Sequence, residues 1–422
     1  MIIRFAVENF RSIRERQELS WVASALKDLE QMTTDVPSVG VSLLHVLAIY
    51  GANASGKTSV LRALSFMTHA VVNSQGSWRP TGPIPIQPFL LDEESNGRTS
   101  YFDIDLIIDG VRINYGFELD SSQVHREWLY AYPRGKKQIW FERQSGSEKE
   151  FHFGKHLQGE NRSIQSLTRA NSLFLSAAAQ NGHQQLLPLF QWFATKLDVV
   201  NFSRRGGVSM KAAELCKEPS GRAALLKLLA AADLGIVDVD ITERKLDEKT
   251  EGALRAFINS LSEKEAEFDA KLPEIRLKHQ AADGKSVALR FDDESEGTKA
   301  LLSLAFPVLH AIKEGGLLCV DELDASLHPL LALEIIKAFL DPALNVRGAQ
   351  LIFNTHDVNL LDSEILRRDQ IWFTEKDGEG STHIYPLSDF RTRRHENLKR
   401  GYLQGRYGAV PVPSPMLGFY GK

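Results

Sequence analysis

The sequence GANASGKT, at residues 51–58, decides the fold class of this chain. It fits the pattern G-x-x-x-x-G-K-[ST] at every specified position. The two glycines let the backbone curl so that successive N–H groups point at phosphate oxygens. A helix that begins at the loop adds the positive end of its dipole to the same site. The pattern therefore predicts a loop that binds the phosphates of a nucleotide.

The flanking residues favour this interpretation over a plain glycine turn. Residues 43–50 form a near-continuous apolar run, which is typical of a strand buried on both faces in a parallel sheet. Residues 57–72 repeat apolar side chains along one stripe, as an amphipathic helix does. We expect Lys57 to reach the β- and γ-phosphates and Thr58 to offer its hydroxyl to Mg²⁺. The residues in and next to the loop that we expect to hold the nucleotide are Gly51, Asn53, Ala54, Ser55, Gly56, Lys57, Thr58 and Ser59.

The composition excludes several classes of protein. A chain of 422 residues with 43% hydrophobic and 25% charged residues is typical of a globular protein with two or three subdomains. The net charge of −4 provides no overall basic field for non-specific nucleic-acid binding. The two cysteines have no partner at ligand spacing, which disfavours a disulfide framework or a structural zinc site. No apolar stretch reaches the ~18 residues of a membrane span, so we expect a cytoplasmic protein without membrane contact.

Two acidic residues close a second apolar run. Residues 317–320 predict a buried strand, and Asp321 and Glu322 follow at the end where ligands bind in open α/β sheets. We expect Asp321 to hold Mg²⁺, because this ion favours a few carboxylate contacts plus water and phosphate oxygens. Glu322 would orient and deprotonate an attacking water. The alternative is a strand that merely ends in acids, and the pairing with residues 51–58 disfavours it.

A histidine follows a third apolar run. Residues 351–353 lead into Asn354-Thr355-His356-Asp357. His356 could hydrogen-bond the γ-phosphate and report whether it is present. A surface histidine in a loop is the alternative. The position directly after a strand favours the functional interpretation.

The remaining segments predict mixed secondary structure. Residues 2–7, 101–118 and 127–153 alternate as antiparallel strands do, with a turn at Asp109-Gly110. Residues 163–231 have a helical pattern, and residues 247–271 form a highly charged helical stretch that we interpret as a solvated face.

Several short motifs follow one another in an order typical of one ATPase class. They are Asn9-Phe10-Arg11-Ser12, the loop at 51–58, Glu294–Thr298, Asp321-Glu322, Asp324–Pro329 and Thr355–Asp357. The chain resembles ABC-class ATPases of the SMC/RecF/OLD kind over nearly its whole length. More closely, it is similar to the short, arm-less AAA-type proteins of the RloA and AriA sort, which are found in bacterial defence loci.

The resemblance implies roles for residues outside the loop. Ser295 and Gly297 match the serine and second glycine of the ABC signature motif, which contacts the γ-phosphate of ATP held by the other subunit. Glu296 stands where that motif usually has its first glycine. Residues 324–328 match the D-loop, which touches the dimer partner. From the residues alone, a simple helix N-cap explains the 295–298 segment equally well.

Two further residues take roles from the resemblance. His356 matches the switch histidine, and it would act with Lys57 and Glu322 in catalysis. Gln87 would sense Mg²⁺ as the glutamine of a Q-loop does.

The fold class implied is α/β. It is a P-loop NTPase of ABC-ATPase type, with a mixed sheet core, an antiparallel β subdomain and a helical insertion. Residues 1–164 would form an N-terminal ATPase lobe with the loop at 51–58 and the β subdomain. Residues 165–285 would be the helical insertion, and residues 286–422 a C-terminal lobe with the remaining motifs.

The function implied is ATP binding and hydrolysis with Mg²⁺ in a homodimer or higher oligomer that sandwiches ATP. The chain would act as a switch that controls a partner effector, a nuclease or toxin encoded nearby, in anti-phage defence. Two alternatives remain open: an ATP-loaded scaffold with incidental turnover, and a RecF-like DNA-repair ATPase. The basic tail at 391–406, with Phe390, Tyr402 and Tyr407 interleaved, could contact DNA or could be a solvated helix with an intersubunit role.

Overall fold

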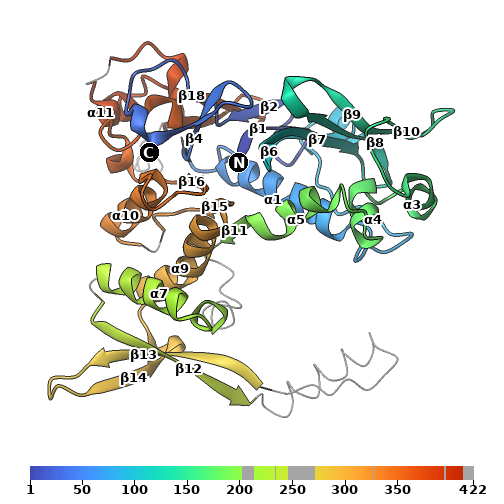
Figure 1. The fold of residues 1–422 in the computed structure, drawn as a ribbon. Helices are drawn as coiled ribbons and strands as arrows, with labels where there is room; N and C mark the ends of the chain where they lie inside the picture. Colours follow the sequence, from blue (N-terminus) through green and yellow to red (C-terminus); the bar gives the residue numbers. More distant parts are fainter. Residues whose placement is uncertain (202–212, 233, 246–270, 326, 394–395, 412–422) are drawn as a thin grey trace, which may run out of the picture. The chain divides into compact units, whose positions relative to one another are not determined.

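The computed structural model describes residues 1–201, 213–232, 234–245, 271–325, 327–393 and 396–411 (Figure 1). The chain divides into two compact units. The first comprises Met1–Val200, Ala311–Ala325 and Ala332–Lys422, and the second comprises Asn201–His310 and Ser326–Leu331.

A six-stranded sheet in the first unit carries the loop at 51–58. Its strands, in spatial order, are β11 (Leu197–Asn201), β15 (Leu317–Asp321), β16 (Gln350–Asn354), β5 (Val46–Gly51), β17 (Ile371–Lys376) and β18 (Thr382–Pro386). The pairs β15–β16, β16–β5 and β5–β17 are parallel, and β17–β18 is antiparallel. Every residue of β5 is buried, which explains its apolar run, because a central parallel strand has no solvent face. The predicted mixed sheet is confirmed.

Helix α1 (Lys57–Asn73) begins directly after the loop. Its buried residues include Val60, Leu64 and Met67, at the spacing that gives one apolar stripe. Gly56 precedes the helix with φ of 106°, a left-handed conformation that glycine adopts without steric cost. The predicted helix at 57–72 is confirmed.

A seven-stranded sheet forms the antiparallel β subdomain of the same unit. Its strands, in spatial order, are β10 (Phe151–Phe153), β9 (Gln138–Gln144), β8 (Val124–Tyr132), β7 (Val111–Leu119), β6 (Ser100–Ile108), β1 (Ile2–Glu8) and β2 (Gln17–Ser20). All neighbouring pairs are antiparallel. The β6–β7 hairpin turns at Asp109 and Gly110, whose φ values of 48° and 77° suit a tight two-residue turn.

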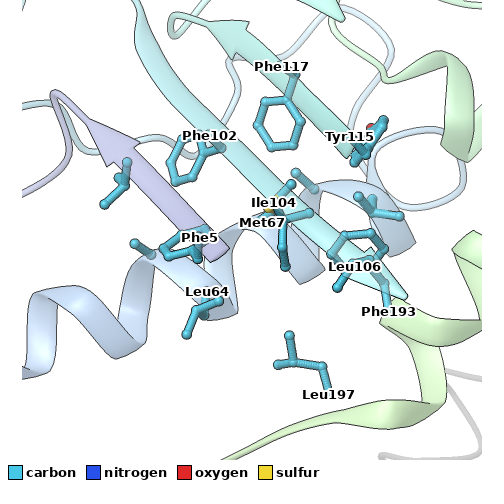
Figure 2. Packing of buried hydrophobic residues seen from close by; sticks show 14 of the residues in the cluster. Phe5, Leu64, Met67, Phe102, Ile104, Leu106, Tyr115, Phe117, Phe193 and Leu197 are labelled. Atoms are coloured by element: carbon cyan, nitrogen blue, oxygen red, sulfur yellow. The ribbon is translucent and has the colours of Figure 1, made fainter. Parts of the chain in front are cut away.

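The core of the first unit lies between this sheet and α1. Phe5, Ile104 and Phe117 come from three neighbouring strands and face Leu64 and Met67 of the helix (Figure 2). Each of these side chains is at most 1% exposed. Burial of such side chains contributes about 1.5–3 kcal/mol each, so this core fixes where α1 begins relative to the strands.

The first unit holds a further small sheet and several short helices. These elements are β3 (Thr33–Val36), β4 (Val41–Leu44), α2 (Glu93–Asn96), α3 (Asn161–Leu167), α4 (Phe174–Gln180), α5 (Leu187–Lys196) and α11 (Leu398–Leu403). Strand β4 ends at Leu44 and β5 begins at Val46, with His45 between them. The apolar run at 43–50 is therefore divided between two strands and is not the single strand predicted.

The second unit combines helices with a three-stranded sheet. It holds α7 (Pro219–Ala231), β12 (Ile236–Lys245), β13 (Lys271–Gln280) and β14 (Ser286–Arg290), and the strands pair antiparallel in that order. Helices α9 (Glu296–Glu314) and α10 (Pro329–Leu340) have residues in both units. The segment expected as a helical insertion, 165–285, therefore contains strands as well as helices. The predicted charged helix at 247–271 lies outside the described residues except for Lys271.

Among the described helices, none has the length and apolar character needed to cross a membrane.

Candidate nucleotide-binding site

The loop at 51–58 lies where β5 ends and α1 begins. Ala54 and Gly56 have positive φ values, 63° and 106°, which curl the backbone between the strand and the helix. Lys57 is buried, and its Nζ donates hydrogen bonds to the backbone carbonyls of Gly51 at 2.8 Å and Ala52 at 2.9 Å. The lysine ammonium thus lies over the loop that the sequence predicts to hold phosphates.

The C-terminal hairpin β17–β18 holds this loop through hydroxyl groups. Ser55 Oγ and Thr374 Oγ1 are 2.7 Å apart, and Thr382 Oγ1 donates to the Ser55 carbonyl at 3.0 Å. Thr382 Oγ1 also lies 2.9 Å from Ser12 Oγ, and Ser12 Oγ lies 2.8 Å from Ser59 Oγ on α1, both within hydrogen-bond distance. Segments more than 300 residues apart in sequence therefore fix the loop conformation together.

The acidic residues meet the loop from the neighbouring strands. Thr58 Oγ1 donates to Asp321 Oδ1 at 3.0 Å, so the hydroxyl and carboxylate predicted to hold Mg²⁺ lie side by side. Asn354, at the end of β16, donates from Nδ2 to the same Asp321 oxygen at 2.6 Å. Both contacts follow from the parallel sheet, because β5, β15 and β16 present their carboxyl ends at one edge.

Glu322 directly follows β15 in an unusual backbone conformation. Its φ of 60° is left-handed, which costs a non-glycine residue about 1–2 kcal/mol. The backbone N–H of Glu322 donates to Asn354 Oδ1. The side chain is exposed, as a group that reaches a substrate must be. Strained residues of this kind cluster at functional sites, where the surrounding structure holds them in place.

His356 lies on the same edge of the sheet. Its backbone N–H donates to the Asp324 carboxylate at 3.2–3.3 Å, which ties the segment after β16 to the turn after β15. Burial and the nearby charge of Lys57 lower the pKa of the His356 imidazole, and the carboxylates of Asp324 and Glu322 oppose that shift. The neutral imidazole is therefore favoured, and an anion bound between His356 and Lys57 would raise the pKa again.

Burial also lowers the pKa of the Lys57 ammonium. The carboxylates of Glu322, Asp324 and Asp321 act in the opposite direction. Asp321 and Glu322, predicted to work with the loop, and Asp324, predicted as part of the D-loop, are thus close enough to act electrostatically on its lysine. The structure brings Lys57, Thr58, Asp321, Glu322 and His356 together at one edge of one sheet.

The residues present fit the groups that such a loop would hold. Thr58 and Asp321 supply the hydroxyl and carboxylate oxygens that Mg²⁺ prefers. The curled loop at the start of α1 offers backbone N–H groups, and Lys57 offers a cation, toward phosphates.

Ser295 and Gly297 lie in the second unit. Ser295 Oγ accepts a hydrogen bond from the Thr298 N–H at 3.1 Å, so Ser295 caps the start of α9. Its side chain is exposed. The N-cap interpretation is therefore confirmed as a local role, and the proposed contact with nucleotide in another subunit stays a prediction.

Gln87 is exposed in the segment before β6. Its backbone carbonyl accepts from the Arg11 N–H at 2.8 Å. Its predicted role in sensing Mg²⁺ stays a prediction.

The aromatic residues of the basic tail pack inside the first unit. Tyr402 and Tyr407 are 6% and 1% exposed, and their rings stack on Phe373 of β17 with centroids 5.6 and 5.9 Å away. These rings are therefore covered by protein. Arg406 pairs with Glu396, and Lys399 donates to Asn359 at 2.7 Å.

Comparison with known protein families identifies the class of this chain. Residues 46–362 match the family model described as "AAA domain, putative AbiEii toxin, Type IV TA system". The match spans most of the chain and includes the loop, the acidic pair and His356. The chain belongs to this AAA family. The predicted ATPase class, of the SMC/RecF/OLD kind, is thereby confirmed.

Solved structures similar to this AAA protein include SMC head domains. The SMC head domain from Thermotoga maritima is 13% identical, with 91% of this chain and 98% of that chain covered and a TM-score of 0.39. An SMC head bound to the C-terminal winged-helix domain of ScpA is 15% identical, with 91% and 97% covered and a TM-score of 0.40. An SMC head from Pyrococcus furiosus, bound to the C-terminal domain of ScpA, is 12% identical, with 91% and 96% covered and a TM-score of 0.39. A search of curated proteins found no match.

Three residues of the site were not predicted. Asn354 carries a signal that could have revealed it, since it ends an apolar strand as Asp321 does. Thr374 and Thr382 carry no such signal, because only the folded sheet brings their hydroxyls to the loop of this AAA domain.

Proposed function

We propose that this protein binds ATP with Mg²⁺ and hydrolyses the bond between the β- and γ-phosphates. The observation that carries the proposal is the contact of Thr58 with Asp321 at 3.0 Å. It joins the loop at 51–58 to the acidic end of β15, and Glu322 is the residue that directly follows that strand. A loop that bound phosphate for a purely structural reason would not need a strained, exposed carboxylate at that position.

Each residue has a defined task in this proposal. Lys57 and the loop N–H groups bind the β- and γ-phosphates, and Thr58 and Asp321 hold Mg²⁺. Bound Mg²⁺ would neutralise charge that develops on the phosphate oxygens. Glu322 orients a water molecule for attack and accepts its proton. His356, kept neutral by its surroundings, donates a hydrogen bond to the γ-phosphate.

We further propose that two copies of the chain hold ATP between them. Ser295 and Gly297 of one copy would face the γ-phosphate bound by the other, and residues 324–328 would touch the partner. The exposure of Ser295 at the start of α9 supports this role. ATP binding would then favour association, and hydrolysis would release it.

The output of the cycle would be control of a partner protein. The family name refers to a toxin of a type IV toxin–antitoxin system. We propose that the chain switches a nuclease or toxin encoded nearby, in defence against phage. Direct DNA binding is less well supported, because the tail tyrosines that could stack on bases are buried.

A comparison of turnover tests the core of the proposal. The Lys57→Ala variant should lose about 100-fold or more of the ATP turnover, as expected when a preorganised electrostatic contact to the transition state is removed. Lys376→Ala changes an exposed lysine of the β17–β18 hairpin and serves as the matched control. Equal turnover in wild type and Lys57→Ala would contradict the assignment of the site.

The Glu322→Gln variant distinguishes a switch that requires ATP hydrolysis from an ATP-loaded scaffold with incidental turnover. It should bind ATP, stop hydrolysis and accumulate as an ATP-dependent dimer, measured by light scattering. Adding Ser295→Arg should abolish that dimer, whereas Ser286→Arg, at an exposed position of β14, should not. If Glu322→Gln still controls the partner normally, the protein acts as an ATP-loaded scaffold, and the interpretation that requires hydrolysis is wrong.

A further inference from the structure

We infer that Asn354 is a positioning residue that sets Asp321 and Glu322 as one unit. The inference rests on the proposed ATPase function and adds a residue whose side chain acts through two others. Asn354 ends β16 and is fully buried. Its side-chain amide contacts both acidic residues after β15, through Nδ2 to Asp321 and through Oδ1 to the Glu322 N–H.

The two partners define the orientation of the amide. Asp321 Oδ1 can only accept a hydrogen bond when ionised, and the Glu322 N–H can only donate. Exchanging the amide oxygen and nitrogen would set two acceptors against each other on one side and two donors on the other. Asn354 is therefore held in a single state, and it in turn holds one oxygen of the predicted metal ligand.

The left-handed turn at Glu322 depends on the same residue. A φ of 60° is unfavourable for glutamate, so the turn persists only where contacts hold it. Asn354 supplies two of them, because its side chain accepts from the Glu322 N–H and its backbone carbonyl accepts from the Leu323 N–H at 3.1 Å. The direction in which the Glu322 carboxylate leaves the strand is thus set from β16.

Asn354 also connects this turn to the other parts of the site. It pairs in register with Ile49 on β5, two residues before the phosphate-binding loop begins. Two residues further along the chain, the His356 N–H binds the Asp324 carboxylate. Each of residues 321–324 therefore has a hydrogen bond to Asn354 or His356, which ties the turn after β15 to the segment after β16.

Glutamine, histidine or serine at this position would not make the same contacts. The asparagine amide is short enough to reach the adjacent strand end and carries one donor and one acceptor in a fixed plane. Outer contacts of this kind orient the groups that bind a metal, and their loss typically costs about 10–100-fold in metal affinity or activity.

Two substitutions test the inference in the full-length protein. Asn354→Ala removes both contacts, and we expect turnover to fall by about 10–100-fold with a raised Mg²⁺ requirement. Asn354→Asp keeps an acceptor for the Glu322 N–H but places a carboxylate against Asp321. A carboxylate cannot donate to Asp321, so we expect turnover of Asn354→Asp to fall at least as far as that of Asn354→Ala, even though the contact with the Glu322 N–H is kept.

Asn114 offers a matched control in the same unit. It is also a buried asparagine that donates to an aspartate, Asp103, at 2.9 Å, but on the outer face of the seven-stranded sheet. Asn114→Ala and Asn114→Asp should change the thermal unfolding midpoint without changing turnover or its Mg²⁺ requirement.

The outcomes are distinguishable from failure of the proposed function. Lys57→Ala and Mg²⁺-dependent binding of a fluorescent ATP analogue are measured in parallel. If the wild type binds but does not hydrolyse ATP, the proposed hydrolysis fails, and the Asn354 inference is judged by the Mg²⁺ requirement for binding. The inference is overturned if Asn354→Ala retains wild-type turnover and Mg²⁺ dependence. It is also overturned if both Asn354 variants lose activity only in proportion to a lowered unfolding midpoint, and it falls together with the proposed function if the wild type neither binds nor hydrolyses ATP.

Discussion

Thr382 packs directly against Gly56, the glycine that precedes α1. A Cβ added to Gly56 would lie 2.6 Å from Thr382 Cγ2, well inside van der Waals contact. The position also has φ of 106°, which disfavours any side chain. The β17–β18 hairpin therefore closes over the phosphate-binding loop and requires glycine at position 56.

Gly56→Ala should weaken nucleotide binding by about 10-fold or more. Holding the loop in its present conformation would cost about 1–2 kcal/mol more with alanine, and that cost is subtracted from the binding free energy. Adding Thr382→Ala should recover only part of the loss. It removes the overlaps with Oγ1 and Cγ2 but keeps the Cβ contact at 2.9 Å and the backbone strain, and it also loses the hydrogen bond to the Ser55 carbonyl. Isothermal titration with ATP and Mg²⁺ measures both. Gly146→Ala, at φ of 76° with open space around the added Cβ, is the control for strain alone. Full rescue by Thr382→Ala would mean that backbone strain contributes nothing.

Thr58→Val should raise the Mg²⁺ concentration needed for half-maximal turnover by about 10-fold, because it removes, at constant shape, the hydroxyl that we propose binds the metal. Thr68→Val is the matched control, because Thr68 lies ten residues further along the same helix, α1. Among the described residues the buried Thr68 hydroxyl has no hydrogen-bond partner, so its removal should leave turnover unchanged and raise stability slightly. An unchanged Mg²⁺ requirement in Thr58→Val would contradict the metal assignment.

Glu322→Gly should be more stable than Glu322→Ala by about 1 kcal/mol, because glycine adopts the left-handed conformation without steric cost. Both variants lack the carboxylate and should be inactive. Chemical denaturation of the two variants measures the difference in the free energy of unfolding. Equal stability would show that the turn after β15 relaxes when the side chain is removed.

Stability should fall as the pH drops below about 6.5, partly because of His45. His45 is 6% exposed, and burial lowers its pKa, opposed by a hydrogen bond to the Ala349 carbonyl. The folded state thus binds a proton less readily than the unfolded state, so stability is complete above the unfolded pKa and is lost as the pH falls through it. Denaturation of His45→Gln at several pH values should show a shallower dependence than wild type. His152→Gln, at an exposed histidine, is the control, and an identical dependence in wild type and His45→Gln would exclude this role.

Tyr407→Phe should preserve or increase stability. The Tyr407 ring is buried in the aromatic cluster around Phe373, and its hydroxyl has no hydrogen-bond partner among the described residues. Tyr407→Ala should instead cost about 3 kcal/mol, since it opens a cavity in that cluster. Tyr385→Phe is the contrasting control, because its hydroxyl donates to Glu375 at 2.9 Å and its loss should destabilise. If Tyr407→Phe destabilises as much as Tyr385→Phe, the hydroxyl has a partner.

Local patterns were sufficient for much of the site. The loop at 51–58, the helix after it and the acids after β15 each depend on neighbours in sequence, and the structure places Lys57, Thr58, Asp321, Glu322 and His356 at one sheet edge. Parallel strands explain this result, because their carboxyl ends meet wherever their order in the sheet allows it. The sequence analysis did not predict that one strand ends and another begins at His45. Strand β4 belongs to the two-stranded sheet and β5 to the six-stranded sheet, and a continuous apolar run contains no signal for such a change.

The sequence by itself determined that a glycine-rich loop follows a buried strand and begins a helix, and the spacing of its glycines, lysine and threonine predicts phosphate binding there. Only the tertiary structure decided what holds that loop and its acids in place. Thr374, Thr382 and Asn354 reach them from strands that are distant in the chain, and hydrogen bonds between such segments depend on strand order and register, which no local pattern encodes.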